Sequence, residues 1–117
     1  MRYVDGFVLP IPRKNLAAYR RLANVGARLW KKHGALEYFE CLGDDLKVPF
    51  GMPFTRLSKL KPGETVAFSF IIFKSRAHRD AVNARVMKDP LLAKMPKKMP
   101  FDPKRMAYGG FKVLVEA

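Results

Sequence analysis

The segment Val66–Phe73 constrains the fold more than any other, because almost all of its residues are apolar. Side chains alternate between the two faces of a β-strand, so a strand here presents apolar groups on both faces. Ala67, Ser69, Ile71 and Phe73 form one row, and Val66, Phe68, Phe70 and Ile72 form the other. The segment is far shorter than the roughly 20 residues of a membrane helix. It predicts the strongest strand of the chain, with apolar side chains on both faces that need cover.

Three further strands are predicted from short runs of β-branched, aromatic and aliphatic residues. They span Tyr3–Leu9, Leu36–Leu42 and Met106–Val115, and the strongest strand runs from Thr65 to Phe73. Pro10 and Pro12 are expected to end the first strand, because proline donates no hydrogen bond to a β-ladder. The segment Gly43–Gly63 contains three prolines and predicts an irregular connection or a short arm.

Two helices are predicted between these strands. Apolar residues at three- and four-residue steps indicate a helix over residues 15–33. Ser75 is a good N-cap for a second helix over Arg76–Lys88, and one more helical turn begins at Asp89. The order strand, helix, strand, strand, helix, strand predicts a single α+β domain over residues 1–117. Both helices are expected on one face of an antiparallel sheet.

Two helices can cover only one face of this sheet, so the other face, called the open face here, needs a partner. Taking each strand separately, we expect the helix-facing rows to contain Val4, Val8, Phe39, Cys41, Phe111, Val113 and Val115. The open face is then expected to carry Tyr3, Asp5, Phe7, Tyr38, Glu40, Phe68, Phe70 and Tyr108. Soluble monomers rarely expose a contiguous apolar patch larger than roughly 300–600 Å². A second copy of the chain is the simplest cover, so a homodimer through the open face is predicted.

Polar groups on this expected open face form the candidate ligand site. Tyr3, Asp5, Tyr38, Glu40 and Tyr108 fall there among apolar neighbours. A carboxylate in such surroundings tends to have a raised pKa and can serve as an acid or a base. A small molecule bound between the sheet and its dimer partner is one interpretation. In the other, Asp5 and Glu40 merely pair with lysine or arginine at the interface.

Basic residues outnumber acidic residues by 23 to 10, which gives a net charge of +13. Several lie on one side of the 15–33 helix and just before it, with no acidic residue among them: Arg13, Lys14, Arg20, Arg21, Arg28, Lys31 and Lys32. Such a face predicts either weak contacts with phosphate backbones or only a solvated surface. A basic nucleic-acid-binding module that uses this helix is the alternative function.

Few residues suit metal, cofactor or covalent chemistry. Cys41 is the only cysteine, so no internal disulfide can form and a reducing, cytoplasmic location is expected. His33 and His78 lack cysteines or paired carboxylates at metal-ligand spacing, and no nucleotide-binding or nucleophile motif occurs. We therefore expect no metal and no cofactor, and the sequence leaves open whether the protein is an enzyme.

Several blocks of residues together carry a family resemblance. They are Tyr3-Val4-Asp5-Gly6-Phe7, Glu40-Cys41, Arg79-Asp80-Ala81-Val82-Asn83, Asp89-Pro90, Met99-Pro100-Phe101-Asp102, Lys104-Arg105-Met106 and Tyr108-Gly109-Gly110-Phe111. The chain resembles the bacterial domain of unknown function (DUF) family 1428, also called YbaA-like, and departs from it in the segment Leu46–Gly63 and in its basicity. The resemblance implies a ferredoxin-like fold of the dimeric α+β barrel type. It implies no established activity.

The loop before the last strand carries further candidate residues. Asp102, Lys104 and Arg105 lie between Pro100 and the strand, so the loop is either a structural lock or the rim of a pocket. The candidate ligand-binding residues are therefore Tyr3, Asp5, Tyr38, Glu40, Phe68, Phe70, Asp102, Arg105 and Tyr108.

Overall fold

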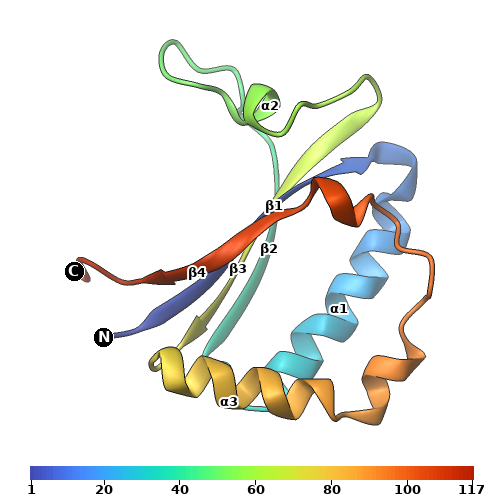
Figure 1. Cartoon of the computed structure of the whole chain (residues 1–117). Coiled ribbons are helices and arrows are strands. Elements are labelled where there is room, and N and C mark those ends of the chain that lie inside the picture. The colour runs from blue at the N-terminus through green and yellow to red at the C-terminus, as the bar shows by residue number, and fades with distance from the viewer.

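A computed structural model describes all residues, 1–117, and has the predicted α+β architecture. The strands are β1 (Tyr3–Pro12), β2 (Glu37–Leu42), β3 (Glu64–Phe73) and β4 (Ala107–Lys112). The helices are α1 (Leu16–Lys32), the short α2 (Phe54–Leu57) and α3 (Arg76–Met87), with 3-10 turns η1 (Arg13–Asn15), η2 (Pro90–Lys94) and η3 (Pro103–Arg105). Figure 1 shows α1 and α3 together on one face of the sheet.

The sheet has the strand order β2-β3-β1-β4, and all neighbouring strands are antiparallel. The expected end of β1 before Pro10 was wrong, because the strand continues through Pro10 and Pro12 and stays paired with β3. β4 pairs with β1 only as far as Val8, so the other side of β1 has no strand beyond that residue. Arg13 N–H donates toward β3, to Gly63 O at 2.9 Å. Since amide directions alternate along a strand, both prolines occupy positions whose amide would face the unpaired side.

Opposed residues in an antiparallel sheet share a face, so the pairing register with β3 assigns every strand. The predicted helix-facing row of β3 is confirmed, with Ile71 and Phe73 buried. Asp5 opposes Ile71 and Tyr3 opposes Phe73, so Tyr3, Asp5 and also Phe7 lie on the helix side. Their expected place on the open face was wrong, because the two valines of β1 had been assigned to the core on apolar character alone.

The same register corrects β2. Tyr38 opposes Ile71, so Tyr38 and Glu40 lie on the helix side of the sheet. Phe39 and Cys41, expected inside, lie on the open face and are exposed. The prediction was wrong because it assumed that Phe39 and Cys41, as apolar residues, must be buried. Tyr38 and Glu40 are partly buried instead, because they find hydrogen-bond partners beneath α1.

β4 is also turned over relative to the prediction. Tyr108 opposes Phe7 and shares its face, whereas Phe111 opposes Val4 on the open face. The strand ends at Lys112, so the valines that follow it extend no β-ladder. Phe111 is 62% exposed, since no helix lies over it.

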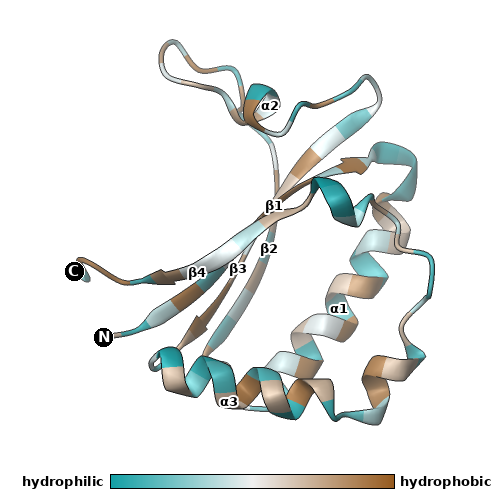
Figure 2. Cartoon of the chain, viewed as in Figure 1, coloured by the Kyte–Doolittle hydropathy of each residue, from teal (hydrophilic) through white to brown (hydrophobic).

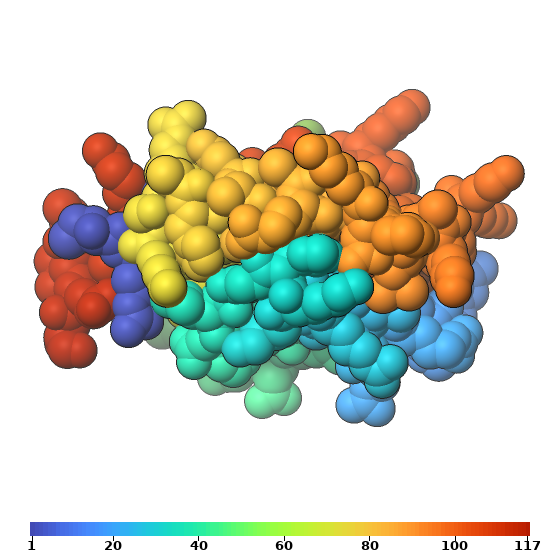
Figure 3. Space-filling view, turned by 90° about the horizontal axis from the view of Figure 1, so that it is seen from below, coloured from blue at the N-terminus to red at the C-terminus, as the bar shows by residue number.

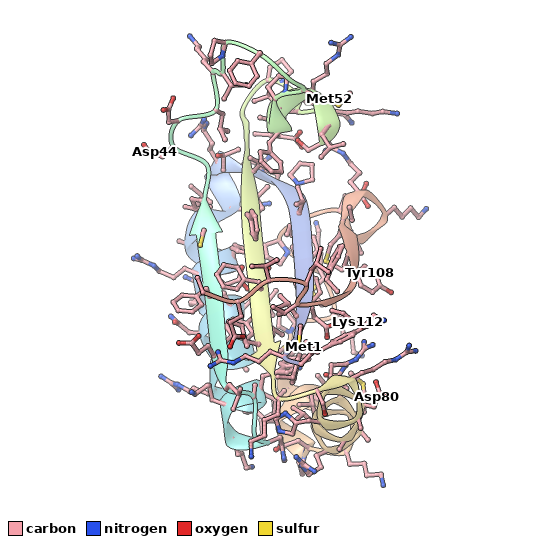
Figure 4. The ribbon with its side chains drawn as sticks, turned by 90° about the vertical axis from the view of Figure 1, so that its left-hand side faces the viewer. Met1, Asp44, Met52, Asp80, Tyr108 and Lys112 are labelled. Carbon is pink, nitrogen blue, oxygen red and sulfur yellow. The ribbon has the colours of Figure 1, made fainter.

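With both carboxylates on the other side, the open face is more apolar than predicted. Its uncovered apolar side chains are Val4, Val8, Phe39, Cys41, Phe68, Phe70, Ile72 and Phe111, and Glu37 lies on the same face opposite Ile72. The ring centres of Phe39 and Phe70 are 5.1 Å apart, and those of Phe68 and Phe70 are 5.6 Å apart. Figure 4 looks onto this face. A continuous aromatic patch therefore remains uncovered in one subunit.

The core lies between the sheet and the two long helices. One cluster joins Leu29 of α1 to Phe73 and to Val82 and Val86 of α3. A second cluster, around Ile11, packs toward the N-terminal part of α1. In Figure 2, brown hydrophobic stretches appear on the strands, whereas α1 and α3 alternate between teal and brown. None of the helices combines the length and the apolar content that crossing a bilayer requires.

Asp89 ties the end of α1 to the turn that follows α3. Its carboxylate accepts hydrogen bonds from Leu91 N–H at 2.8 Å, from Lys32 Nζ at 2.9 Å and from His33 Nε2 at 2.7 Å. Figure 3 shows the α3 segment and the chain after it packed directly against α1. The predicted helical turn at Asp89 is confirmed, and its cap also fastens the two helices together.

Candidate functional site

Two tyrosine hydroxyls converge on the carboxylate of Glu40, on the helix side of the sheet. Tyr38 of β2 donates to Glu40 Oε2 at 2.8 Å, and Tyr19 of α1 donates to Oε1 at 2.6 Å. Two of the predicted site residues therefore lie together, and Tyr19 joins them unpredicted. In the sequence, Tyr19 stands out only as a tyrosine within the apolar stripe of a helix. Such a tyrosine is expected to be buried, as it is here, and a buried hydroxyl needs a hydrogen-bond partner.

Glu40 stands at the junction of two cavities. A groove of about 570 Å³ runs between α1 and β2 and includes Arg20 and Asn24. A second cavity, of about 230 Å³, lies between α1, the sheet and the chain before β4. Its apolar lining is Phe7, Leu9, Leu22, Trp30, Ile71, Met95, Met99, Phe101 and Met106. Tyr19, Ala23, Tyr38 and Glu40 line both cavities, so a molecule in either one can reach the carboxylate.

Burial and the neighbouring Glu40 carboxylate raise the pKa of Tyr19 and of Tyr38 well above the ordinary value of 10.0. Burial is the largest cause for both. Both phenols therefore stay protonated at physiological pH and serve as fixed hydrogen-bond donors. A carboxylate offers about four acceptor positions, of which the two phenols occupy two. The remaining positions on Glu40 are free to accept from a bound molecule.

Gly26 allows α1 to lie close to Tyr38. A Cβ atom at this position would stand 2.9 Å from Tyr38 Oη, too close for van der Waals contact. One helical turn further on, the Trp30 ring lies 6.4 Å from the Tyr38 ring, and Trp30 Nε1 donates to Asn83 at 3.0 Å. The missing side chain at Gly26 thus helps to set the position of the Tyr38 hydroxyl against Glu40.

Tyr3 and Asp5, also predicted as site residues, form a separate cluster with Arg79 of α3. Arg79 Nη1 lies 3.4 Å from Asp5 Oδ1, and Arg79 Nη2 donates to the Tyr3 hydroxyl at 3.3 Å. Asp5 is 8% exposed, and its Oδ1 atom makes no hydrogen bond. Burial raises the pKa of Asp5, and the charge of Arg79 offsets this only in part. These residues line neither cavity at Glu40. Asp5 and Arg79 instead form an ion pair within the subunit.

The three predicted aromatic site residues outside β1 and β2 lie apart from Glu40. Phe68 and Phe70 lie on the open face, on the other side of the sheet. Tyr108 is 72% exposed, and its ring stacks on Phe7 with centres 6.0 Å apart. Only this contact links Tyr108 to the second cavity, which Phe7 lines.

The loop before β4 is fastened by its charged residues. Asp102 accepts from Lys104 N–H at 3.0 Å and so caps η3. Arg105 makes a bidentate ion pair with Glu64, at 2.6 and 2.9 Å, and donates to Lys59 O at 2.9 Å. These contacts fasten the loop, and Met99, Phe101 and Met106 of the same stretch line the second cavity, so both the lock and the pocket rim remain predictions. No three His, Cys, Asp or Glu side chains lie close enough together to hold a metal ion.

Solved structures share this fold. The chain aligns over 99% of its length with 98% of a dimeric ferredoxin-like protein from an uncultured marine organism, at a TM-score of 0.55 and 12% identity. It also aligns over its full length with 99% of Rv0793 from Mycobacterium tuberculosis, at a TM-score of 0.51 and 13% identity. At these identities the similarity shows a ferredoxin-like fold and nothing finer.

Sequence comparison gives the family. The chain is 40% identical over 116 residues to the uncharacterized protein YbaA of Escherichia coli K12, with 99% of both chains covered. The YbaA protein of Shigella flexneri matches to the same extent. Residues 2–103 match the family model described as "Protein of unknown function (DUF1428)". The predicted resemblance is confirmed, and the chain belongs to the DUF1428 family.

Proposed function

We propose that this protein is a homodimer whose subunits each bind a small, mainly apolar molecule with one hydrogen-bond donor, beside Glu40. The convergence of Tyr19 and Tyr38 on the Glu40 carboxylate carries the proposal. Two phenols hold this acceptor in one orientation, at the point where an apolar cavity meets a groove. An acceptor fixed among apolar walls is the usual construction of a small-molecule site.

The lining selects the chemistry of the ligand. Phenylalanine, tryptophan and methionine side chains favour a flat or flexible apolar body, and methionine adapts to irregular shapes. A hydroxyl or amine can donate to the free positions on Glu40, whereas a ligand carboxylate would be repelled by it. The proposed ligand is therefore a neutral or cationic molecule of modest size.

We propose the ligand on the helix side of the sheet, because Glu40 lies on that side. The sequence placed it between the sheet and its dimer partner, on the assumption that Tyr38 and Glu40 lie on the open face. In the dimer, the partner subunit would cover the aromatic patch around Phe70 instead. The description of the marine ferredoxin-like protein as dimeric supports a dimer.

Trp30 is the only tryptophan and lines the second cavity, so its fluorescence reports binding there. We would titrate the protein with 4-ethylphenol, 4-ethylanisole and 4-ethylbenzoate, which differ only in the polar group. The phenol should bind about tenfold more tightly than the anisole, because a hydrogen bond to a charged acceptor contributes about 1.5 kcal/mol. The benzoate should bind most weakly.

Glu40→Gln should abolish the preference for the phenol, and Glu37→Gln is the matched control. Glu37 belongs to the same strand but lies on the open face opposite Ile72, is exposed and lines neither cavity. Equal affinities for the three probes, no response to the phenol at millimolar concentration, or an unchanged preference in Glu40→Gln would each overturn the proposal.

Binding to nucleic acid is a second candidate function, favoured by the basic face of α1. Arg20, Arg21 and Arg28 are exposed, and a groove beside α1 contains Lys14, Arg21, Lys94 and Lys98 without any acidic residue. Association with a phosphate backbone would be indifferent to sequence and would weaken steeply as salt is raised. Replacing the three arginines of α1 by glutamine should then remove binding to a fluorescent oligonucleotide at low salt.

A further inference from the structure

The connection between β2 and β3, Gly43–Gly63, is an arm that carries unburied apolar side chains. Phe50 is 85% exposed and Met52 is 63% exposed. Val48, Phe54 and Leu57 are exposed at between 41 and 58%. A soluble subunit gains nothing from holding five large apolar residues in water within ten positions, so the arm is expected to meet another surface.

The arm projects to one side of the molecule. In Figure 1 it leaves the end of the sheet and extends away from the face that α1 and α3 cover. In Figure 4, which looks onto the open face, Met52 and Asp44 mark the arm beyond one end of the strands. The C-terminal tail extends on the same side in Figure 1, and its Leu114 is 89% exposed. Whatever covers the open face therefore lies beside both projections.

Aromatic contacts join the arm to the open face. The Phe54 ring lies 6.4 Å from the Phe68 ring, Phe68 lies 5.6 Å from Phe70, and Phe70 lies 5.1 Å from Phe39. The apolar surface thus runs without a break from α2 in the arm, across β3, to the edge strand β2. One partner that covers the sheet face meets the arm as part of the same surface.

The arm is also ordered by its own contacts. Ser58 Oγ donates to Phe54 O at 2.6 Å, and Leu60 N–H donates to Thr55 O at 2.9 Å. At the base of the arm, Arg105 donates to Lys59 O. A segment that is already folded loses little conformational entropy when it is buried, so its apolar side chains stabilise a complex more effectively.

We infer that the arm is a clasp for a second copy of this chain: its apolar side chains, Phe50 and Met52 foremost, pack against the partner subunit beside the sheet-to-sheet interface. The inference rests on the proposed homodimer and extends it, because it adds a segment outside the sheet to the contact. A second copy fits best because the arm surface is continuous with the face that the proposed dimer buries. In a two-fold dimer each subunit then both extends an arm and receives one.

The test uses a photo-crosslinking residue, p-benzoylphenylalanine, in the full-length protein. Placed at Phe50, it should yield a covalent dimer on irradiation. Placed at Met87 on α3, which is 61% exposed on the helix layer, it should yield none. A protein that sediments as a dimer but gives no crosslinked dimer from position 50 would overturn the clasp while leaving the proposed dimer intact.

A second variant distinguishes a specific clasp from non-specific association of the apolar side chains. The double change Phe50→Ser and Met52→Ser should raise the dimer dissociation constant about 10- to 100-fold without altering the thermal unfolding of the isolated subunit. Met87→Ser, on the exposed side of α3, is the control. An unchanged dissociation constant overturns the clasp, and so does Phe50-dependent sedimentation with phosphatidylglycerol vesicles. A wild-type protein that stays monomeric at all concentrations defeats the dimer and the clasp together.

Discussion

The hydrogen bonds to Glu40 depend on a single residue without a side chain, Gly26. Gly26→Ala adds a methyl group 2.9 Å from Tyr38 Oη, so the phenol must move away from Glu40. Alanine favours a helix by about 1 kcal/mol over glycine, yet overpacking costs typically 1–3 kcal/mol. We expect the free energy of unfolding in urea to fall by about 1 kcal/mol, and the Trp30 fluorescence to change because its neighbour Tyr38 has shifted.

The Tyr38→Phe background supplies the control for Gly26. Without the hydroxyl, the added methyl group meets only the ring carbon Cζ, at 3.7 Å, which is ordinary contact. Gly26→Ala should then be neutral or stabilising by up to about 1 kcal/mol. If the substitution destabilises both backgrounds equally, the hydroxyl is not what requires the glycine.

Asp5 predicts a pH dependence of stability that is unusual for a carboxylate beside an arginine. Because burial raises its pKa above 3.8, the folded protein holds the proton of this carboxyl more tightly than the unfolded chain does. The stabilising contribution of Asp5 is complete below the unfolded-state pKa of 3.8 and is lost as the pH rises through the higher pKa of the folded state. The unfolding free energy of the wild type relative to Asp5→Asn should therefore decline with rising pH. A relative stability that grows with pH would mean that the attraction of Arg79 outweighs burial.

At the scale of the elements, Asp89 connects α1 to the turn after α3. The hydrogen bond from Leu91 N–H, followed by those from Lys32 and His33, holds the pKa of Asp89 well below its ordinary range. Asp89→Asn keeps the cap on Leu91 but loses the charge, whereas Asp89→Ala loses both. We expect Asp89→Ala to be the less stable in urea unfolding at pH 7. Equal stabilities would mean that the cap contributes nothing.

The charge of Asp89 is tested by pH. Since its folded pKa is depressed, its contribution is present above the ordinary aspartate pKa and is lost as the pH falls toward the folded value. The advantage of the wild type over Asp89→Asn should shrink in acid. An advantage that stays constant as the pH falls would contradict this account.

The strands show what the sequence could and could not predict. The limits of the helices and the row of Ile71 and Phe73 followed from local patterns, because apolar spacing alone decides them. The faces of the β1 and β2 residues could not be predicted in this way, because a carboxylate such as Asp5 or Glu40 is not expected to be buried. Their partners, Arg79 and Tyr19, are distant in sequence, and only the fold brings them near. A polar side chain is buried only where it has a hydrogen-bond or ion-pair partner, and the periodicity of a strand does not predict that partner.

As a whole, the molecule is a two-layer body with helices on one side and an aromatic surface on the other. Phe70, at the centre of that surface, contacts Phe39 and Phe68. Phe70→Lys places a charge where the proposed dimer is driest and should convert a dimer into monomers or into aggregates, as measured by light scattering. Met87→Lys, on the helix layer, should leave the mass unchanged. A wild-type monomer at micromolar concentration would contradict the prediction.

The two prolines of β1 affect how a subunit behaves before the proposed dimer forms. A newly made chain with an uncovered apolar face risks adding strands from other chains to its sheet, the first step toward amyloid. Strand addition needs amide donors along the free edge, and Pro10 and Pro12 supply none on the side that β4 leaves unpaired. Along the Pro10–Pro12 end of β1, subunits can therefore associate through their faces but cannot add strands edge to edge.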